Sequence, residues 1–164
     1  MRIRVAELYR TCTVLFNDIM LRISKLTDYA TLLLTHMARA PQQVYSARGL
    51  AEQAALPLPV AAKLLKLLAR EGLLVSQRGA AGGYVLARAP QRISMAQILA
   101  AVEGPLAVTE CALGRGVCEM EKGCATRPHW QLIGHALQVA LEAVNLADMV
   151  APKAAPVRLQ RLER

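Results

Sequence analysis

The chain has 164 residues, of which 54% are hydrophobic, and its formal net charge is +8. This length suits one domain, or a small domain with an extension, and a composition rich in Ala and Leu with a single Phe and a single Trp favours helices over a β-sandwich. No run of about 18 apolar residues occurs, so a transmembrane helix is excluded, and Asp18 interrupts the apolar N-terminus, which argues against a signal peptide. We therefore expect a cytoplasmic protein that is not bound to a membrane.

The positive charge is unevenly distributed along the chain. Residues 20–90 carry nine Lys and Arg against three Asp and Glu, whereas residues 91–150 carry four against six. The tail, residues 151–164, is basic again, with four against one. A basic first half favours a module that binds a polyanion such as nucleic acid, joined to a module of different character. A basic surface that serves only solubility would have the same charge distribution.

The first helix of the fold is expected from Ser24 to about Arg39. Apolar residues recur there at steps of three and four, as on one face of a helix, and Pro41 follows as a stop signal. The apolar stripe consists of Ile23, Leu26, Ala30, Leu33, Leu34 and Met37.

Two shorter helices are expected next, separated by a Pro-containing break at residues 56–59. The first of them starts at Ser46, a good N-cap residue, and its inward-facing residues are Leu50, Ala51 and Ala54. The second runs from about Pro59 to Glu71, and Gly72 ends it. Its apolar face consists of Val60, Leu64, Leu67 and Leu68. Two short helices joined by a brief turn predict a helix-turn-helix.

A β-hairpin is expected directly after these helices. Residues 73–77 and 84–87 are short apolar stretches, and a Gly-rich segment at residues 78–83 separates them. A hairpin that follows a helix-turn-helix is the element order of a winged helix. The expected fold class is therefore mainly α, a winged helix-turn-helix with a small β-hairpin wing.

The second half of the chain is expected to hold a helix capped by Ser94 and ending near Val102, a loop at residues 105–128, and a long helix from about His129 to Val150. The long helix carries two apolar stripes. One stripe can pack on its own domain and the other on a second copy, so we interpret the helix as the dimerisation element of a homodimer. A helix wrapped by its own core is the alternative. The two stripes are Ile133, Leu137, Ala140, Val144 and Ala147, and Leu132, Ala136, Val139, Ala143, Leu146 and Val150.

Candidate DNA contacts lie on the expected winged helix. Lys63, Lys66 and Arg70 share one side of the second helix of the helix-turn-helix, mostly away from its apolar face, as a recognition helix in a major groove requires. Arg78 at the hairpin tip is placed to enter a minor groove. The remaining candidates, both for phosphate contacts, are Ser46 and Arg48.

Three cysteines in the loop are candidate metal ligands. Cys111, Cys118 and Cys124 are spaced C-x6-C-x5-C, wider than the close pairs typical of zinc sites. In a reducing cytoplasm, wide spacing on a Gly-containing loop favours thiolates around an iron–sulfur cluster, although three ordinary thiols remain the alternative. Three thiolates leave one ligand to be supplied. The nearby choices are His129, Glu110 and Glu119, and Asp28 on the first helix is a distant choice.

Together, the expected winged helix and the cysteine loop resemble the Rrf-two superfamily of bacterial transcription regulators, over about residues 20–150. The segment Cys124-Ala125-Thr126-Arg127-Pro128 is most similar to regulators of the SUF iron–sulfur assembly system. The other matching pieces are the start at residues 23–30, the wing with Arg78-Gly79 and Gly82-Gly83-Tyr84, the segment from Ile98 to Val102-Glu103-Gly104, and the three cysteines.

The resemblance implies a homodimer that binds a pseudo-palindromic double-stranded DNA operator and holds a [2Fe-2S] or [4Fe-4S] cluster on Cys111, Cys118 and Cys124; we prefer [2Fe-2S]. Some relatives take the fourth ligand from a histidine three residues after the last cysteine, but Arg127 stands there in this chain, and His129 is displaced by two. Other relatives use an acidic residue on the first helix of the partner subunit, a place that Asp28 matches. We therefore choose Asp28 as the fourth ligand, with His129 as the alternative.

The sequence thus predicts a cluster-dependent repressor of SUF assembly genes, and not an enzyme, since no catalytic triad or substrate-pocket motif is visible. The alternatives are a repressor that senses nitric oxide or thiol redox state without a stable cluster, and an iron–sulfur electron carrier. We divide the chain into five parts. They are an extension (1–19), a winged helix-turn-helix (20–90), a linking helix with the cysteine loop (91–128), a dimerisation helix (129–150) and a basic disordered tail (151–164). The extension is expected either to precede the natural start at Met20 or to form a loosely attached helix.

Overall fold

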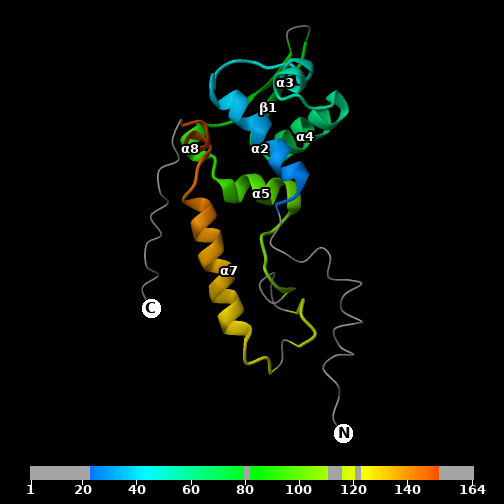
Figure 1. The fold of residues 1–164 in the computed structure, drawn as a ribbon. Coiled ribbons are helices and arrows are strands. Elements are labelled where there is room, and N and C mark those ends of the chain that lie inside the picture. Colours follow the sequence, from blue (N-terminus) through cyan, green and yellow to red (C-terminus); the bar gives the residue numbers. More distant parts are fainter. Residues whose placement is uncertain (1–22, 80–81, 111–115, 121–122, 152–164) are drawn as a thin grey trace.

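The computed structural model describes residues 23–79, 82–110, 116–120 and 123–151. A winged helix-turn-helix unit forms one end of this part of the chain, and a single helix, α7 (Arg127–Glu142), extends from it to the cysteine-containing segment (Figure 1). The predicted fold class is confirmed: the described residues are mainly helical, with one antiparallel two-stranded hairpin. The predicted extension at 1–19 and nearly all of the predicted tail lie outside the described residues.

Helix α2 (Lys25–Ala38) forms the centre of the winged-helix unit. Ser24 caps it, and the Ser24 side chain accepts a hydrogen bond from the Thr27 backbone N–H. Most of the predicted stripe is confirmed, because the residues from Ala30 to Met37 in that stripe are completely buried. The prediction is wrong for Ile23 and Leu26, which are 56% and 47% exposed, because at the start of α2 it is Thr27 that faces inward and is completely buried.

Helices α3 (Ala47–Gln53) and α4 (Leu58–Arg70) form the predicted helix-turn-helix and pack against each other. The inward face of α3 is confirmed, since Leu50, Ala51 and Ala54 are buried. The predicted face of α4 is rotated: Val60 and Leu67 are only partly buried, and the buried residues are Ala61, Leu64, Leu65 and Leu68. Contacts of α4 with α2, with α3 and with a later helix, α5 (Met95–Glu103), decide which side faces inward.

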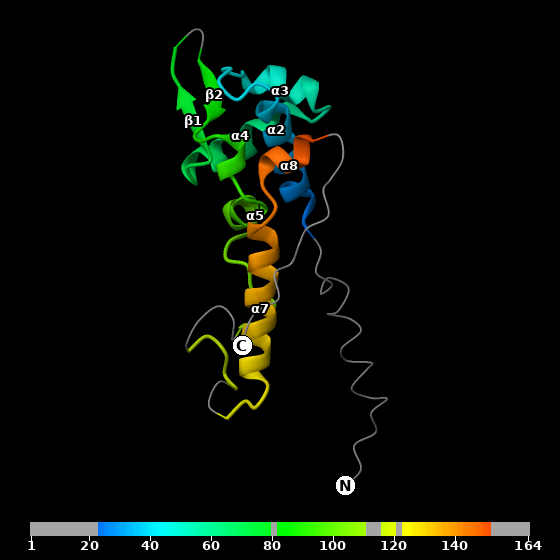
Figure 2. The ribbon, with the colours of Figure 1, turned by 90° about the vertical axis from the view of Figure 1, so that its left-hand side faces the viewer.

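Strands β1 (Leu74–Gln77) and β2 (Gly83–Leu86) form the predicted wing, with Leu74 paired to Leu86 and Gln77 to Gly83. The hairpin stands beside α3 and α4 (Figure 2). A bridge between Tyr45 and Tyr84 anchors it: the Tyr45 N–H donates to the Tyr84 carbonyl at 2.9 Å, and the Tyr84 N–H donates to the Tyr45 carbonyl at 2.8 Å. The wing is therefore fastened to the segment that leads into α3.

The second half of the chain contains η1 (Pro90–Arg92), α5 (Met95–Glu103), α7 (Arg127–Glu142) and α8 (Leu146–Val150). The prediction of one continuous helix to Val150 is wrong, because the chain turns at Asn145. The Asn145 side chain accepts hydrogen bonds from the N–H groups of Ala147 and Asp148, and the Asp148 carboxylate accepts one from the Asn145 N–H, which together cap a new helix.

The break in the helix returns the chain to the core. Leu146 is completely buried, its N–H donates to the Ile93 carbonyl at 2.8 Å, and the Met95 N–H donates to the Val144 carbonyl at 2.9 Å. Helix α7, in contrast, contains no buried residue, and of the two predicted apolar stripes only Leu146, which lies in α8, is buried within the chain. Among the described residues, no helix is long and apolar enough to cross a membrane.

Candidate DNA-binding surface and cysteine loop

The predicted cations of α4 lie on its outer side. Lys63 and Lys66 are exposed, and the buried residues of the helix lie on the other side. Arg70 is exposed as well, at the last residue of α4, and its Nε lies 3.1 Å from the Glu71 carboxylate. A pair this exposed contributes little to stability, but it gives the Arg70 guanidinium an acidic partner on the next residue of the chain.

Arg78, the predicted minor-groove contact of the wing, is exposed and lies directly after β1. The backbone around it is closely packed: a Cβ on Gly83 would lie 2.4 Å from the Tyr45 carbonyl oxygen, and a Cβ on Gly82 would lie 2.4 Å from the Gln77 carbonyl oxygen. Only glycine fits at these two positions. Residues 80 and 81 lie outside the described residues.

Ser46 and Arg48 mark the start of α3, and both are exposed. The Ser46 hydroxyl oxygen accepts a hydrogen bond from the Gly49 N–H at 3.0 Å, so Ser46 serves first as the N-cap of α3. Its hydroxyl hydrogen can still be donated to a phosphate oxygen. The structure therefore shows Ser46 as a helix cap, and its phosphate contact stays a prediction.

The cysteine segment lies at the end of α7 remote from the winged-helix unit (Figures 1 and 2). Cys118 and Cys124 are both half-buried free thiols, whereas Cys111 lies outside the described residues. The Cys124 Sγ is 3.3 Å from the Thr126 hydroxyl oxygen. This hydroxyl, helped by the backbone N–H groups of Thr126 and Arg127 and by the Arg127 charge, lowers the pKa of the Cys124 thiol.

The thiol chemistry fits an iron–sulfur cluster, because a lowered pKa favours the thiolate, which is the form that binds metals. Within the described residues no three His, Cys, Asp or Glu side chains form a group that could hold a metal ion. A cluster at Cys118 and Cys124 would therefore require Cys111 and a further donor as well.

The candidates for the fourth ligand lie in different places. Asp28 is exposed in the first turn of α2, which belongs to the winged-helix unit at the opposite end of α7 from the cysteines (Figure 1). His129 is exposed in the first turn of α7, and Glu110 and Glu119 are exposed on the segment before it. Within one chain, and for the two described cysteines, the fold does not bring Asp28 next to Cys118 or Cys124.

One polar contact was not predicted from the sequence. The Glu103 carboxylate, at the end of α5, accepts hydrogen bonds from the Ser24 N–H at 3.0 Å and from the Thr27 hydroxyl at 2.5 Å. These two contacts hold the first turn of α2, where Asp28 lies, against the end of α5. The sequence signal is the segment Val102-Glu103-Gly104, which the resemblance includes without indicating its partner.

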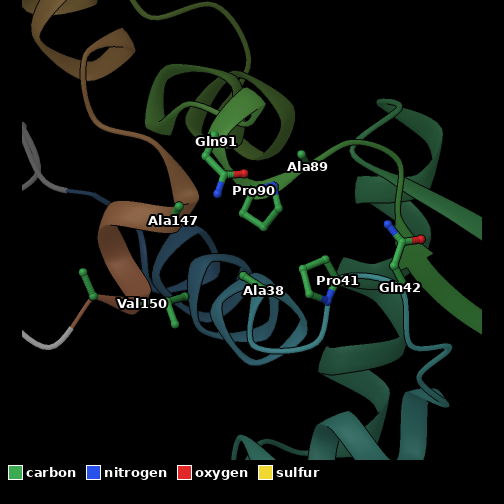
Figure 3. A pocket seen from close by; sticks show the side chains of 9 residues that line it. Ala38, Pro41, Gln42, Ala89, Pro90, Gln91, Ala147 and Val150 are labelled. Carbon is green, nitrogen blue, oxygen red and sulfur yellow. The ribbon is translucent and has the colours of Figure 1, made fainter.

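A cavity of about 470 Å³ lies between the end of α2, the segment around η1 and α8 (Figure 3). Its lining is mainly small and apolar, and the polar side chains that it offers are the carboxamides of Gln42 and Gln91. The cavity thus has no titratable side chain to support acid–base chemistry or to bind a metal.

Comparisons with known proteins agree with this arrangement. Residues 23–152 match the Rrf2 family, described as iron-dependent transcriptional regulators. The HTH-type transcriptional repressor NsrR of Streptomyces coelicolor is 29% identical over 146 residues, which cover 88% of this chain and 98% of that protein.

Solved structures show the same fold. CymR, the global cysteine regulator of B. subtilis, is similar with a TM-score of 0.63 and 30% identity, covering 80% of this chain and 97% of that one. IscR of T. potens is similar with a TM-score of 0.61 and 25% identity, covering 86% and 93%. The predicted resemblance to the Rrf-two superfamily is thereby confirmed, and the chain belongs to the Rrf2 family of transcriptional regulators.

Proposed function

We propose that the protein is a homodimeric DNA-binding repressor whose affinity for its operator depends on an iron–sulfur cluster. The observation that carries this proposal is the pair of half-buried free thiols, Cys118 and Cys124, on the segment before α7, with the Thr126 hydroxyl 3.3 Å from the Cys124 Sγ. The lowered pKa of Cys124 supports it. A thiolate-favouring setting in a family of iron-dependent regulators supports metal binding over an inert thiol.

The cluster would be held by Cys111, Cys118 and Cys124, with [2Fe-2S] preferred to [4Fe-4S]. When bound, such a cluster supplies a group whose presence and redox state report on iron–sulfur supply. Asp28 is at the opposite end of α7 from the cysteines of its own chain, so we assign the fourth ligand to Asp28 of the partner subunit. His129, which is exposed close to the cysteines, is the alternative ligand.

The homodimer is supported by the exposed apolar surface of α7. The helix has 16 residues and none is buried, while Leu132 and Ile133 are 58% and 48% exposed. A helix of this length draws its stability in proteins from packing of an apolar face, so α7 needs a covering surface. Two copies of α7 provide it, and Ile23 and Leu26, also exposed, can extend the interface.

In this dimer the two winged-helix units would bind the two halves of a pseudo-palindromic operator. Lys63, Lys66, Arg70 and Arg78 would supply cations to the DNA, and Ser46 and Arg48 are assigned to phosphates. We propose that the regulated genes encode SUF assembly proteins and that loss of the cluster relieves repression, so that shortage of clusters raises their production.

The first experiment is anaerobic purification followed by visible absorption spectroscopy and measurement of iron, sulfide and zinc. A coloured protein with iron and sulfide in stoichiometric amounts supports the cluster. A colourless protein with stoichiometric zinc, or with no metal, contradicts it and favours a repressor that senses through the activated Cys124 thiol.

The second experiment is a promoter-binding titration with the cluster-loaded protein, the cluster-free protein and a variant with Cys111, Cys118 and Cys124 all changed to Ala. A Cys12→Ala variant serves as the matched control, because Cys12 lies outside the cysteine loop in sequence. We expect the loaded protein and the control to bind alike and the triple variant to resemble the cluster-free protein. Equal affinity of all four for DNA would reject a sensing role, and DNA binding without salt dependence would favour an electron carrier.

The Asp28 assignment has its own test. Asp28→Asn should alter the absorption and electron paramagnetic resonance spectra of the cluster, whereas His129→Gln should leave them unchanged. The reverse result would place the fourth ligand on His129.

A further inference from the structure

Helix α4 has an unusual set of polar side chains. From Leu58 to Arg70 its only polar residues are Lys63, Lys66 and Arg70, and it contains no Asn, Gln, Asp, Glu, Ser or Thr. Ammonium and guanidinium groups donate hydrogen bonds and accept none. Every hydrogen bond that the side chains of this helix make to a base must therefore be donated by the protein.

The arrangement of these residues selects the two lysines. Pro59, Ala62, Lys63 and Lys66 follow the spacing i, i+3, i+4 and i+7, so they share one face of α4, and both lysines are exposed on it. Arg70 lies at the end of the helix beside Glu71, whereas recognition helices contact bases mainly through their N-terminal part. The face that enters the groove thus carries two ammonium groups next to small apolar side chains.

Only one base presents two adjacent acceptors in the major groove. Guanine offers O6 and N7, adenine offers one acceptor beside a donor, and cytosine offers a donor. We propose that Lys63 and Lys66 determine operator specificity, each by donating hydrogen bonds to O6 and N7 of one guanine. This inference rests on the DNA-binding function proposed above. Ala62, between Pro59 and Lys63 on this face, would contact the methyl group of a neighbouring thymine.

The helix geometry also restricts the spacing of these guanines. Three residues along an α-helix correspond to a rise of about 4.5 Å. One base step along a strand is about 3.4 Å. Each half of the operator should therefore contain two guanines that are one or two base pairs apart, with thymine beside one of them.

The experiment begins with anaerobically purified full-length protein and a library of DNA duplexes with a randomised core. Duplexes enriched by binding should contain two guanines at this spacing in each half-site. Each guanine is then replaced by 7-deazaguanine, which lacks N7, and we expect affinity to fall at least about 5-fold at each of the two positions. Replacement of guanines elsewhere in the same duplex is the DNA control.

Two variants assign the contacts. Lys63→Met and Lys66→Met remove the charge but keep a long unbranched side chain on an exposed position of α4, so both should fold, as circular dichroism can verify. Each variant should lose its sensitivity to 7-deazaguanine at one guanine and keep it at the other. Arg92→Met, which removes an exposed positive charge from η1, should keep both sensitivities.

The outcomes separate this inference from the function on which it rests. If both lysine variants weaken binding to all duplexes by the same factor and lower the salt dependence, the lysines contact phosphates and the inference is wrong, while DNA-dependent repression stands. Enriched duplexes without the guanine pair would also overturn it. If no duplex is bound in preference to random DNA, the proposed function fails together with the inference.

Discussion

The Glu103 carboxylate accepts a hydrogen bond from the Thr27 hydroxyl at 2.5 Å, although the two residues are 76 positions apart in the sequence. Thr27 is completely buried, and Glu103 also accepts the Ser24 N–H, one of the donors that the start of α2 leaves without an intrahelical partner. The end of α5 thus caps α2 from outside. Asp28, the residue after Thr27, is held in place by this contact.

We predict that Glu103→Gln lowers the free energy of unfolding by about 1 kcal/mol near neutral pH, because the amide oxygen that would accept these two hydrogen bonds lacks the negative charge that strengthens them. Chemical denaturation of the variant and of the unchanged protein measures the difference. Glu52→Gln, which changes an exposed carboxylate of α3, is the control and should have no comparable effect.

The same contact predicts a pH dependence. The Thr27 hydroxyl first, and the Ser24 N–H second, lower the pKa of Glu103 below its ordinary value of 4.5. A lowered pKa in the folded state means that the stabilisation is present above pH 4.5 and is lost as the pH falls through the folded-state pKa. The stability difference between the unchanged protein and Glu103→Gln should therefore shrink in acid, and a difference that stays constant would contradict the assignment.

Gly83→Ala should displace the wing. Its new Cβ would lie 2.4 Å from the Tyr45 carbonyl oxygen, so the two-way bridge between Tyr45 and Tyr84 would have to open. We expect a loss of about 1–3 kcal/mol in the free energy of unfolding and weaker DNA binding. Thermal denaturation and a DNA titration measure both. Val75→Ala on β1, which removes part of a half-exposed side chain, should change neither quantity strongly.

Leu146→Ala should be among the more destabilising substitutions, because Leu146 is completely buried and connects α8 to the core of the winged helix. Removal of a buried leucine side chain costs about 2–5 kcal/mol. Met149→Ala on the same helix, where the side chain is 45% exposed, is the matched control. Urea denaturation of the two variants should separate them clearly, and equal midpoints would show that α8 does not belong to the cooperative core.

The proposed dimer interface predicts the behaviour of a double variant of α7. Leu132→Glu with Ile133→Glu places two charges on the exposed apolar surface, so sedimentation should show a monomer at micromolar concentration where the unchanged protein is a dimer. Circular dichroism should also show a loss of helix, since α7 would then lack a covering surface. Gln131→Glu, exposed beside them, should remain dimeric. A double variant of unchanged mass would place the interface elsewhere.

The cysteine loop shows where prediction from sequence ends. Spacing and composition indicate that Cys111, Cys118 and Cys124 belong together, because they are close in the chain. Asp28 is far from all three in the sequence. The fold also places it at the other end of α7 from Cys118 and Cys124, so its assignment depends on a second copy. The lowered pKa of Cys124 likewise depends on the position of the Thr126 hydroxyl, which residue spacing alone does not specify.

The sequence by itself determined the element order of the winged helix and the position of its cationic helix. Apolar periodicity, Ser N-caps, prolines and glycines act over only a few residues, so they can be recognised in a short stretch of sequence. Only the tertiary structure decided the break at Asn145, the rotation of the buried face of α4 and the contact of Glu103 with α2. Each of these depends on residues distant in the chain. Leu146 departs from the axis of α7 because its N–H donates to the Ile93 carbonyl and its side chain packs in the core. Glu103 reaches Ser24 and Thr27 because α5 packs on α2.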